Sequence, residues 1–141
     1  MRHVAMGLLA GVGSVCLLLA LATAWCLAGV RSSQVARMWV PGPQYLLKAH
    51  LDFLMMTGLL FVFFLLFERL HLAPPSSIVA AMSVGSITNP AGFVALAFRP
   101  DLPQRPTAPF GALMALSFVL TTVGYGGAAW HVLHAVVHAS I

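Results

Sequence analysis

The amino-acid sequence predicts an all-α polytopic membrane protein, a four-transmembrane-helix bundle in which 1–141 form a single domain. Three observations predict this class. Sixty per cent of the residues are hydrophobic and only 7% are charged, whereas a soluble domain has about 25% charged residues. The hydrophobic residues also gather in four runs, each near the roughly 20 residues that a helix needs to cross a bilayer. This composition excludes a cytosolic globular domain, a disordered tail and a nucleic-acid-binding protein, because seven scattered basic residues form no basic patch.

The four predicted spans are 4–30, 46–67, 78–98 and 109–130. The first is longer than the roughly 7–15-residue hydrophobic region of a signal peptide, so we interpret it as a retained span. Pro-Gly-Pro at 41–43 and Pro-Pro at 74–75 mark loops before the second and third spans. The runs do not alternate as strands of a closed barrel would, so helices are the expected spanning structure.

The loops differ in positive charge, which predicts an orientation. With four spans, both termini and the second loop share one side of the membrane, and the first and third loops share the other. The first and third loops carry Arg31, Arg37, Lys48, Arg99 and Arg105. The opposite side carries Arg2 and Arg69. The positive-inside rule therefore predicts that loops 1 and 3 are cytoplasmic, with the termini across what we expect to be a bacterial inner membrane.

Polar residues inside the predicted spans are candidate functional residues, because such groups are expensive in hydrocarbon. His50 and Asp52 fall in the first turns of the second span. They either lie hydrated at the interface, or His50 faces the bundle interior and ligates a metal centre. Asn89 falls near the middle of the third span, and Pro90 after it leaves the carbonyl of Ser86 without its helical donor, which should loosen the helix. Asn89 is expected either to form an interhelical hydrogen bond or to line a pocket.

Three histidines at i, i+3 and i+7 share one helical face near the C-terminus: His131, His134 and His138. They form either a solvated, pH-responsive helix end or a metal-binding face, and the first is favoured because zinc needs a defined tetrahedral set of ligands.

The depths of two histidines in the membrane limit how a haem could be held. At about 1.5 Å per residue, His50 lies roughly 10 Å to one side of the centre of its helix, and His131 lies roughly 18 Å to the other side of the centre of its own. One iron cannot bind both. Iron held by His50 would therefore keep an open position, as a Lewis acid requires, unless a residue other than histidine closes it.

Two segments resemble a known group of enzymes. These are Lys-Ala-His-Leu-Asp at 48–52 with a methionine pair after it, and Gly-Ser-Ile-Thr-Asn at 85–89 with Phe93 one turn on. Over the second and third spans the chain resembles the styrene oxide isomerases and hydroxylaminobenzene mutases. These are small four-helix membrane enzymes that rearrange aromatic substrates without net redox change. The resemblance implies that His50 ligates haem b in a trimeric assembly and that Asn89 occupies the position of an asparagine found in both groups.

Three positions depart from that pattern. Met56 stands where both groups have asparagine, and Gly85 stands where the isomerases have aspartate. Phe93 falls on the catalytic tyrosine of the isomerases, and its ring cannot donate a hydrogen bond. We therefore expect a relative with different chemistry rather than an epoxide isomerase as such.

The leading hypothesis is a haem-b-dependent intramembrane isomerase or mutase of a small apolar, aromatic substrate. Haem iron held by His50 would polarise a substrate atom, Asn89 would orient the substrate, and Asp52 would orient His50 or a water. Met56 and Phe93 are candidate substrate-pocket residues, and a homo-oligomer is expected. An electron-transfer subunit ranks last, because a second haem ligand is lacking at the depth of His50. The alternative is a non-enzymatic small membrane protein, either a partner subunit or one that handles metal through His131, His134 and His138.

Overall fold

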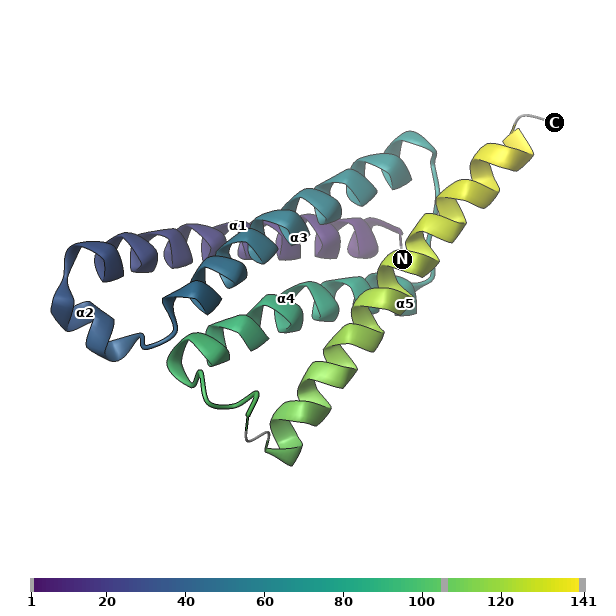
Figure 1. Ribbon diagram of the computed structural model, residues 1–141. Helices are drawn as coiled ribbons and strands as arrows, with labels where there is room; N and C mark the ends of the chain where they lie inside the picture. Colours follow the sequence, from purple (N-terminus) through teal and green to yellow (C-terminus); the bar gives the residue numbers. More distant parts are fainter. Residues whose placement is uncertain (1, 105–106, 140–141) are drawn as a thin grey trace.

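Four long helices cross the molecule in the computed structural model, which describes residues 2–104 and 107–139. The elements are α1 (Arg2–Ser32), α2 (Gln34–Trp39), α3 (Pro43–Arg69), α4 (Ser76–Phe98) and α5 (Ala108–Ala139) (Figure 1). All except α2 contain a stretch long and apolar enough to cross a membrane: Ala5–Ser32, Pro43–Arg69, Ser76–Phe98 and Ala108–His138. The predicted all-helical class with four spans is confirmed. Arg105, one of the basic residues used to predict orientation, lies outside the described residues.

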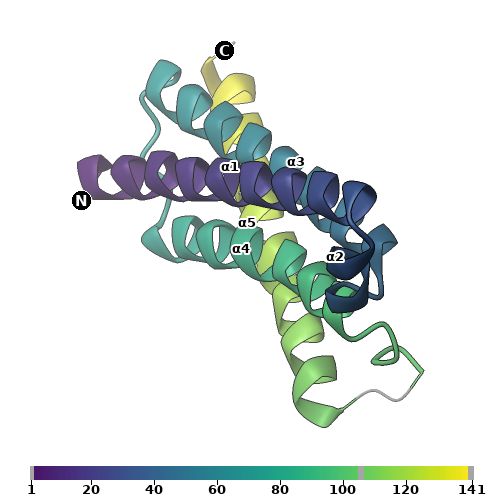
Figure 2. The ribbon, with the colours of Figure 1, turned by 90° about the vertical axis from the view of Figure 1, so that its left-hand side faces the viewer.

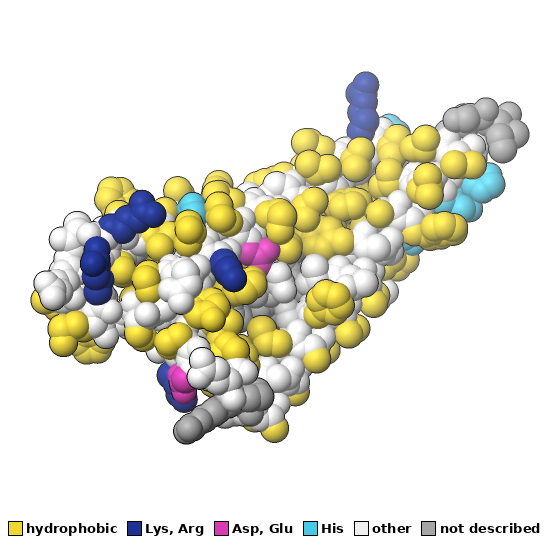
Figure 3. Space-filling view, viewed as in Figure 1, with side chains coloured by type: hydrophobic (Ala, Val, Ile, Leu, Met, Phe, Trp, Pro, Cys, Tyr) yellow, Lys and Arg dark blue, Asp and Glu magenta, His cyan; other side chains and the backbone are white. Residues whose placement is uncertain are grey.

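Helices α1 and α3 lie side by side along most of their length, and α4 packs beneath the pair (Figures 1 and 2). Helix α5 packs along α4, and its C-terminal end projects beyond the other helices. The core between α1, α3 and α4 is formed by closely packed apolar side chains, among them Leu9, Leu60, Phe67, Val79 and Met82. Hydrophobic side chains also cover the visible surface (Figure 3). A surface of this kind suits contact with lipid rather than water.

Glycine lets α4 and α5 approach closely. A Cβ atom on Gly85 would lie 2.7 Å from Thr121 Oγ1, and one on Gly124 would lie 2.5 Å from the backbone nitrogen of Met82. Small residues at such crossings are the usual means of packing helices in membranes, where van der Waals contact replaces the hydrophobic effect. The hydroxyl of Thr121 donates to the carbonyl of Ser117 on its own helix at 2.9 Å.

Pro90 lies inside α4, and the helix continues through it from Ser76 to Phe98. The expected loosening is therefore not a break. Ser86, whose carbonyl loses its helical donor to Pro90, receives the thiol of Cys16 from α1 at a sulfur–oxygen distance of 3.7 Å. A neighbouring helix thus supplies part of what the proline removes.

The helix ends differ from the predicted spans. Helix α3 begins at Pro43, three residues before the predicted start, so His50 and Asp52 lie about two turns or more inside it rather than in its first turns. The short helix α2 was not predicted; Ser33 caps its N-terminus by accepting from the backbone N–H of Ala36. Helix α5 runs on past 130 through the three C-terminal histidines. No proline or glycine interrupts it there.

Candidate functional site

Asp52 and Asn89, both predicted as site residues, meet in the interior. Asp52 on α3 is 7% exposed, and Nδ2 of Asn89 on α4 donates to its Oδ2 at 2.7 Å. Of the alternatives considered for Asn89, the interhelical hydrogen bond is the one seen. A carboxyl group held inside a span is costly and is kept only with a partner. This pair therefore joins α3 to α4 at a buried polar point.

Further polar side chains surround the pair and connect all four spans. Ser86 Oγ and the hydroxyl of Tyr125 on α5 are hydrogen-bonded at 2.7 Å. The thiol of Cys16 on α1 faces the carbonyl of Ser86, and Asp52 lies within electrostatic range of both Cys16 and Tyr125. We call this group, Cys16, Asp52, Ser86, Asn89 and Tyr125, the interior polar cluster.

Sequence reasoning identified only the two amide and carboxyl members of the interior polar cluster. Cys16 is a free, buried cysteine, and its place in an apolar run gives no sign that it contacts a polar group. The position of Ser86, four residues before Pro90, indicates a backbone carbonyl without its helical donor. Tyr125 gives a weaker indication, because a phenol in an apolar span needs a hydrogen-bond partner. Neither observation shows which residue makes the contact.

His50 lies on a different face of α3 from Asp52, because two residues along a helix turn the side chain by about 200°. Its Nδ1 lies 2.9 Å from the carbonyl oxygen of Ala20 and 3.4 Å from Thr23 Oγ1, both on α1. Thr23 donates its own hydroxyl to α1 carbonyls. Nδ1–H therefore donates to Ala20, and Nε2 carries the lone pair. Ala20 thus makes the orienting contact that sequence reasoning assigned to Asp52.

Two hollows flank the contact between α1 and α3. The first, which we call the His50 hollow, has a volume of about 360 Å³ and is lined by Ala24, Leu27, Ala28, Arg31, Leu47 and His50. The second, the apolar pocket, has a volume of about 300 Å³ and lies between α1, α3 and α4. Its lining includes Thr23, Cys26, Phe53, Ile87, Ala91 and Phe98.

The two predicted substrate-pocket residues line neither hollow. Met56 is 4% exposed and packs in the core. Phe93 is half-buried on α4. The apolar pocket is lined instead by residues one or two positions from sequence-predicted ones, such as Phe53 and Ile87, which hydropathy alone does not distinguish from lipid-facing residues.

The C-terminal histidines are placed on the projecting part of α5. The rings of His134 and His138 lie 4.2 Å apart between centroids. Among residues 2–104 and 107–139, no group of three His, Cys, Asp or Glu side chains is arranged to hold a metal ion. The geometry therefore lends no support to a metal-binding face formed by His131, His134 and His138 within one chain.

Four apolar spans, a lipid-compatible surface and a buried polar interior decide the class. The chain is an integral membrane protein. In comparisons with family models, curated proteins and solved structures, nothing matches it.

Proposed function

We propose that this membrane protein is a haem-b-dependent isomerase or mutase that rearranges small apolar, aromatic molecules within the bilayer. The observation that carries the proposal is the setting of His50. Its Nδ1 is committed to the carbonyl of Ala20, which leaves Nε2 for another partner. A histidine ligand to a metal commonly donates its other N–H to a backbone carbonyl, because that bond fixes the tautomer and raises the basicity of the ligating nitrogen.

The surroundings of His50 suit a porphyrin. Ala24 and Ala28 lie one turn apart on α1 and present short side chains, and Leu27 and Leu47 complete an apolar wall. When bound there, haem iron supplies a Lewis acid that polarises a substrate oxygen or nitrogen. The chain's own contribution is to orient the imidazole through Ala20 and to keep water from the porphyrin.

The apolar pocket supports the substrate class. Its volume of about 300 Å³ and its apolar lining fit a small aromatic molecule that enters from lipid. Thr23 lines this pocket and also contacts His50, so a single side chain of α1 lies between the apolar pocket and the imidazole ring. Asn89 is not among the residues that line this pocket, and its amide nitrogen donates to Asp52. A role for Asn89 in orienting the substrate therefore rests on the resemblance alone.

The His50 hollow lies on the outer flank of the α1–α3 pair, away from α4 and α5. A group bound there would be open on one side in a single chain. We therefore propose that a second copy of the chain covers it in a homo-oligomer, a trimer by the resemblance described above.

An absorption spectrum tests the cofactor. The protein is expressed with haem supply, purified in detergent and scanned in the visible range; a Soret band is expected. His50→Ala should abolish the band, whereas His134→Ala, which removes an exposed histidine of α5, should leave it unchanged. Absence of the band from the unmodified chain would overturn the haem proposal. Conversion of phenylhydroxylamine to a product of equal mass, lost in His50→Ala, would then test the reaction.

A further inference from the structure

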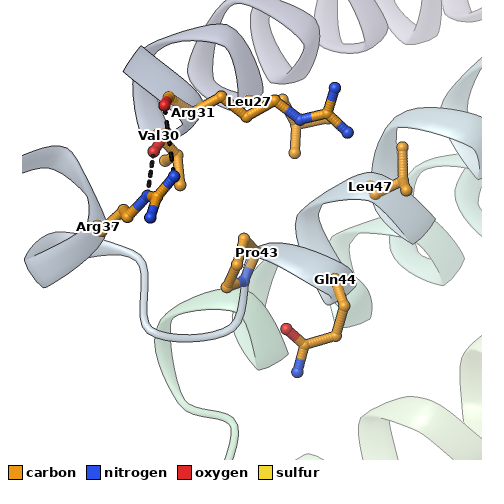
Figure 4. A pocket seen from close by; sticks show the side chains of 7 residues that line it. All are labelled: Leu27, Val30, Arg31, Arg37, Pro43, Gln44 and Leu47. Atoms are coloured by element: carbon orange, nitrogen blue, oxygen red, sulfur yellow. Dashed lines mark hydrogen bonds between the residues drawn. The ribbon is translucent and has the colours of Figure 1, made fainter. Parts of the chain in front are cut away.

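A third hollow lies at the end of the molecule where α1, α2 and α3 meet, next to the His50 hollow, with which it shares Leu27, Arg31 and Leu47. It has a volume of about 350 Å³ and is lined by Leu27, Val30, Arg31, Arg37, Pro43, Gln44 and Leu47 (Figure 4). We call it the arginine hollow. Arg31 and Arg37 border it from different helices, as Figure 4 shows.

The neighbouring helix α2 places the arginine hollow at the depth of lipid head groups. None of its residues is buried. Its large apolar side chains are exposed: Met38 is 80% exposed, Trp39 76% and Val35 65%. In a membrane protein, exposed tryptophan and a short helix of this kind lie at the boundary between hydrocarbon and water.

The two arginines of the hollow differ in what they bind. Arg37 donates from Nε to the carbonyl of Val30 at 3.0 Å and from Nη2 to that of Arg31 at 3.4 Å. Its charge thereby satisfies the negative C-terminal end of α1. The side chain of Arg31 has no hydrogen-bond or ion-pair partner within the described part of the chain, and no acidic side chain lines the hollow. The hollow therefore carries uncompensated positive charge.

Apart from Gln44, the remaining lining is apolar. Leu27, Val30, Pro43 and Leu47 form walls beside the two guanidinium groups. A free phosphate ion would contact the guanidinium groups but leave the apolar walls exposed to water. A phospholipid would contact the guanidinium groups with its phosphate and the apolar walls with its acyl chains.

We propose that the arginine hollow binds the phosphate of an anionic phospholipid, with Arg31 as the main contact. Arg37 adds a second positive charge, and the upper acyl chain lies against Pro43, because Leu27 and Leu47 also face the proposed porphyrin site. Lys48, exposed one turn after Gln44, adds to the positive potential at this end of α3. Basic pockets between transmembrane helices at the membrane surface are known to bind such head groups.

Native mass spectrometry of the full-length protein tests the proposal, with phosphatidylglycerol and phosphatidylcholine as probes. Phosphatidylglycerol should bind in preference. Arg31→Gln should weaken its binding about fivefold, as expected for one basic residue at a membrane surface, and Arg31→Lys should keep most of it. The matched control is Arg69→Gln, which removes an exposed arginine at the other end of α3 and should leave binding unchanged.

Three results would overturn the proposal. The first is equal binding of the two lipids. The second is inorganic phosphate that competes as well as the lipid, because the apolar walls would then have no role. The third is an Arg31→Gln protein that binds lipid normally but loses haem, since Arg31 also lines the His50 hollow and would then serve the porphyrin carboxylates. A missing Soret band in the unmodified chain would count against the proposed enzyme and leave lipid binding to be decided by these measurements.

Discussion

The buried carboxyl group of Asp52 accepts a 2.7 Å hydrogen bond from the side chain of Asn89. Removing one partner of a buried polar pair leaves the other with its full desolvation cost, whereas replacing both with apolar side chains can be nearly neutral. His50 and Asp52 are two residues apart but have separate environments, because helical rotation points them to different faces. His50 contacts a carbonyl of α1, and Asp52 contacts an amide of α4.

The Asp52–Asn89 pair predicts a non-additive mutant cycle. Asn89→Leu should lower stability by about 1–3 kcal/mol, because Asp52 then lies buried without its donor. Asp52→Leu combined with Asn89→Leu should recover most of that loss. Thermal unfolding of the purified single and double variants in detergent measures both effects. A double variant as unstable as Asn89→Leu alone would show that the hydrogen bond is not what stabilises this part of the bundle.

At the scale of whole helices, the contact between α4 and α5 depends on glycine at particular positions. Gly124 faces the backbone of Met82, so a methyl group there would meet atoms that cannot move aside. Gly126 lies on the same helix with nothing within 4 Å of the position its Cβ would take. The two positions differ in environment and not in intrinsic helix propensity.

Gly124→Ala should therefore destabilise the protein by roughly 1–3 kcal/mol through overpacking. Gly126→Ala should be neutral or slightly stabilising, because alanine is the better helix former. Thermal unfolding of the two variants in the same detergent gives the comparison. Equal effects of the two substitutions would contradict the close approach of α4 and α5.

Hydropathy predicted the existence of the spans because lipid imposes a minimum apolar length on each. It did not predict their ends, because the helical hydrogen bonds of the backbone can continue beyond the apolar residues. Helix α5, for example, continues through its histidines to Ala139. Nor did it predict which polar groups meet. Helices that are apolar all round give no sign of which face packs inward, so the pairing of Asn89 with Asp52 and of Ser86 with Tyr125 needed the structure. The partner of His50 is a backbone carbonyl, and because every residue has one, the sequence does not indicate which residue His50 contacts.

At the scale of the whole molecule, the interior polar cluster joins every span. Cys16 comes from α1, Asp52 from α3, Ser86 and Asn89 from α4, and Tyr125 from α5. Because helices in lipid lack a hydrophobic force between them, such contacts help to select one arrangement of the bundle. The helix α5, which packs mainly on α4, gains its specificity from the glycine contacts and from Tyr125.

The two ends of the molecule differ in charge. In Figure 3 most Lys and Arg side chains in view lie toward the end that carries α2, and histidines gather near the far end of α5. Positively charged loops are retained in the cytoplasm during insertion, so we predict that α2 faces the cytoplasm. Arg31, Arg37 and Lys48 would then face the leaflet that carries the negative surface potential, where the proposed lipid site would be filled.

Single-cysteine labelling tests this orientation. Gln34→Cys lies at the α2 end and Ala73→Cys lies in the loop between α3 and α4, and both positions are exposed. Exposed Cys26 is first replaced by alanine, while buried Cys16 is kept. In intact cells, a membrane-impermeant maleimide should label the cysteine at 73 and reach the one at 34 only after permeabilisation. The reverse labelling pattern would place the arginine hollow on the outer side of the membrane. It would also show that the basic residues near α2 do not determine the orientation of the chain.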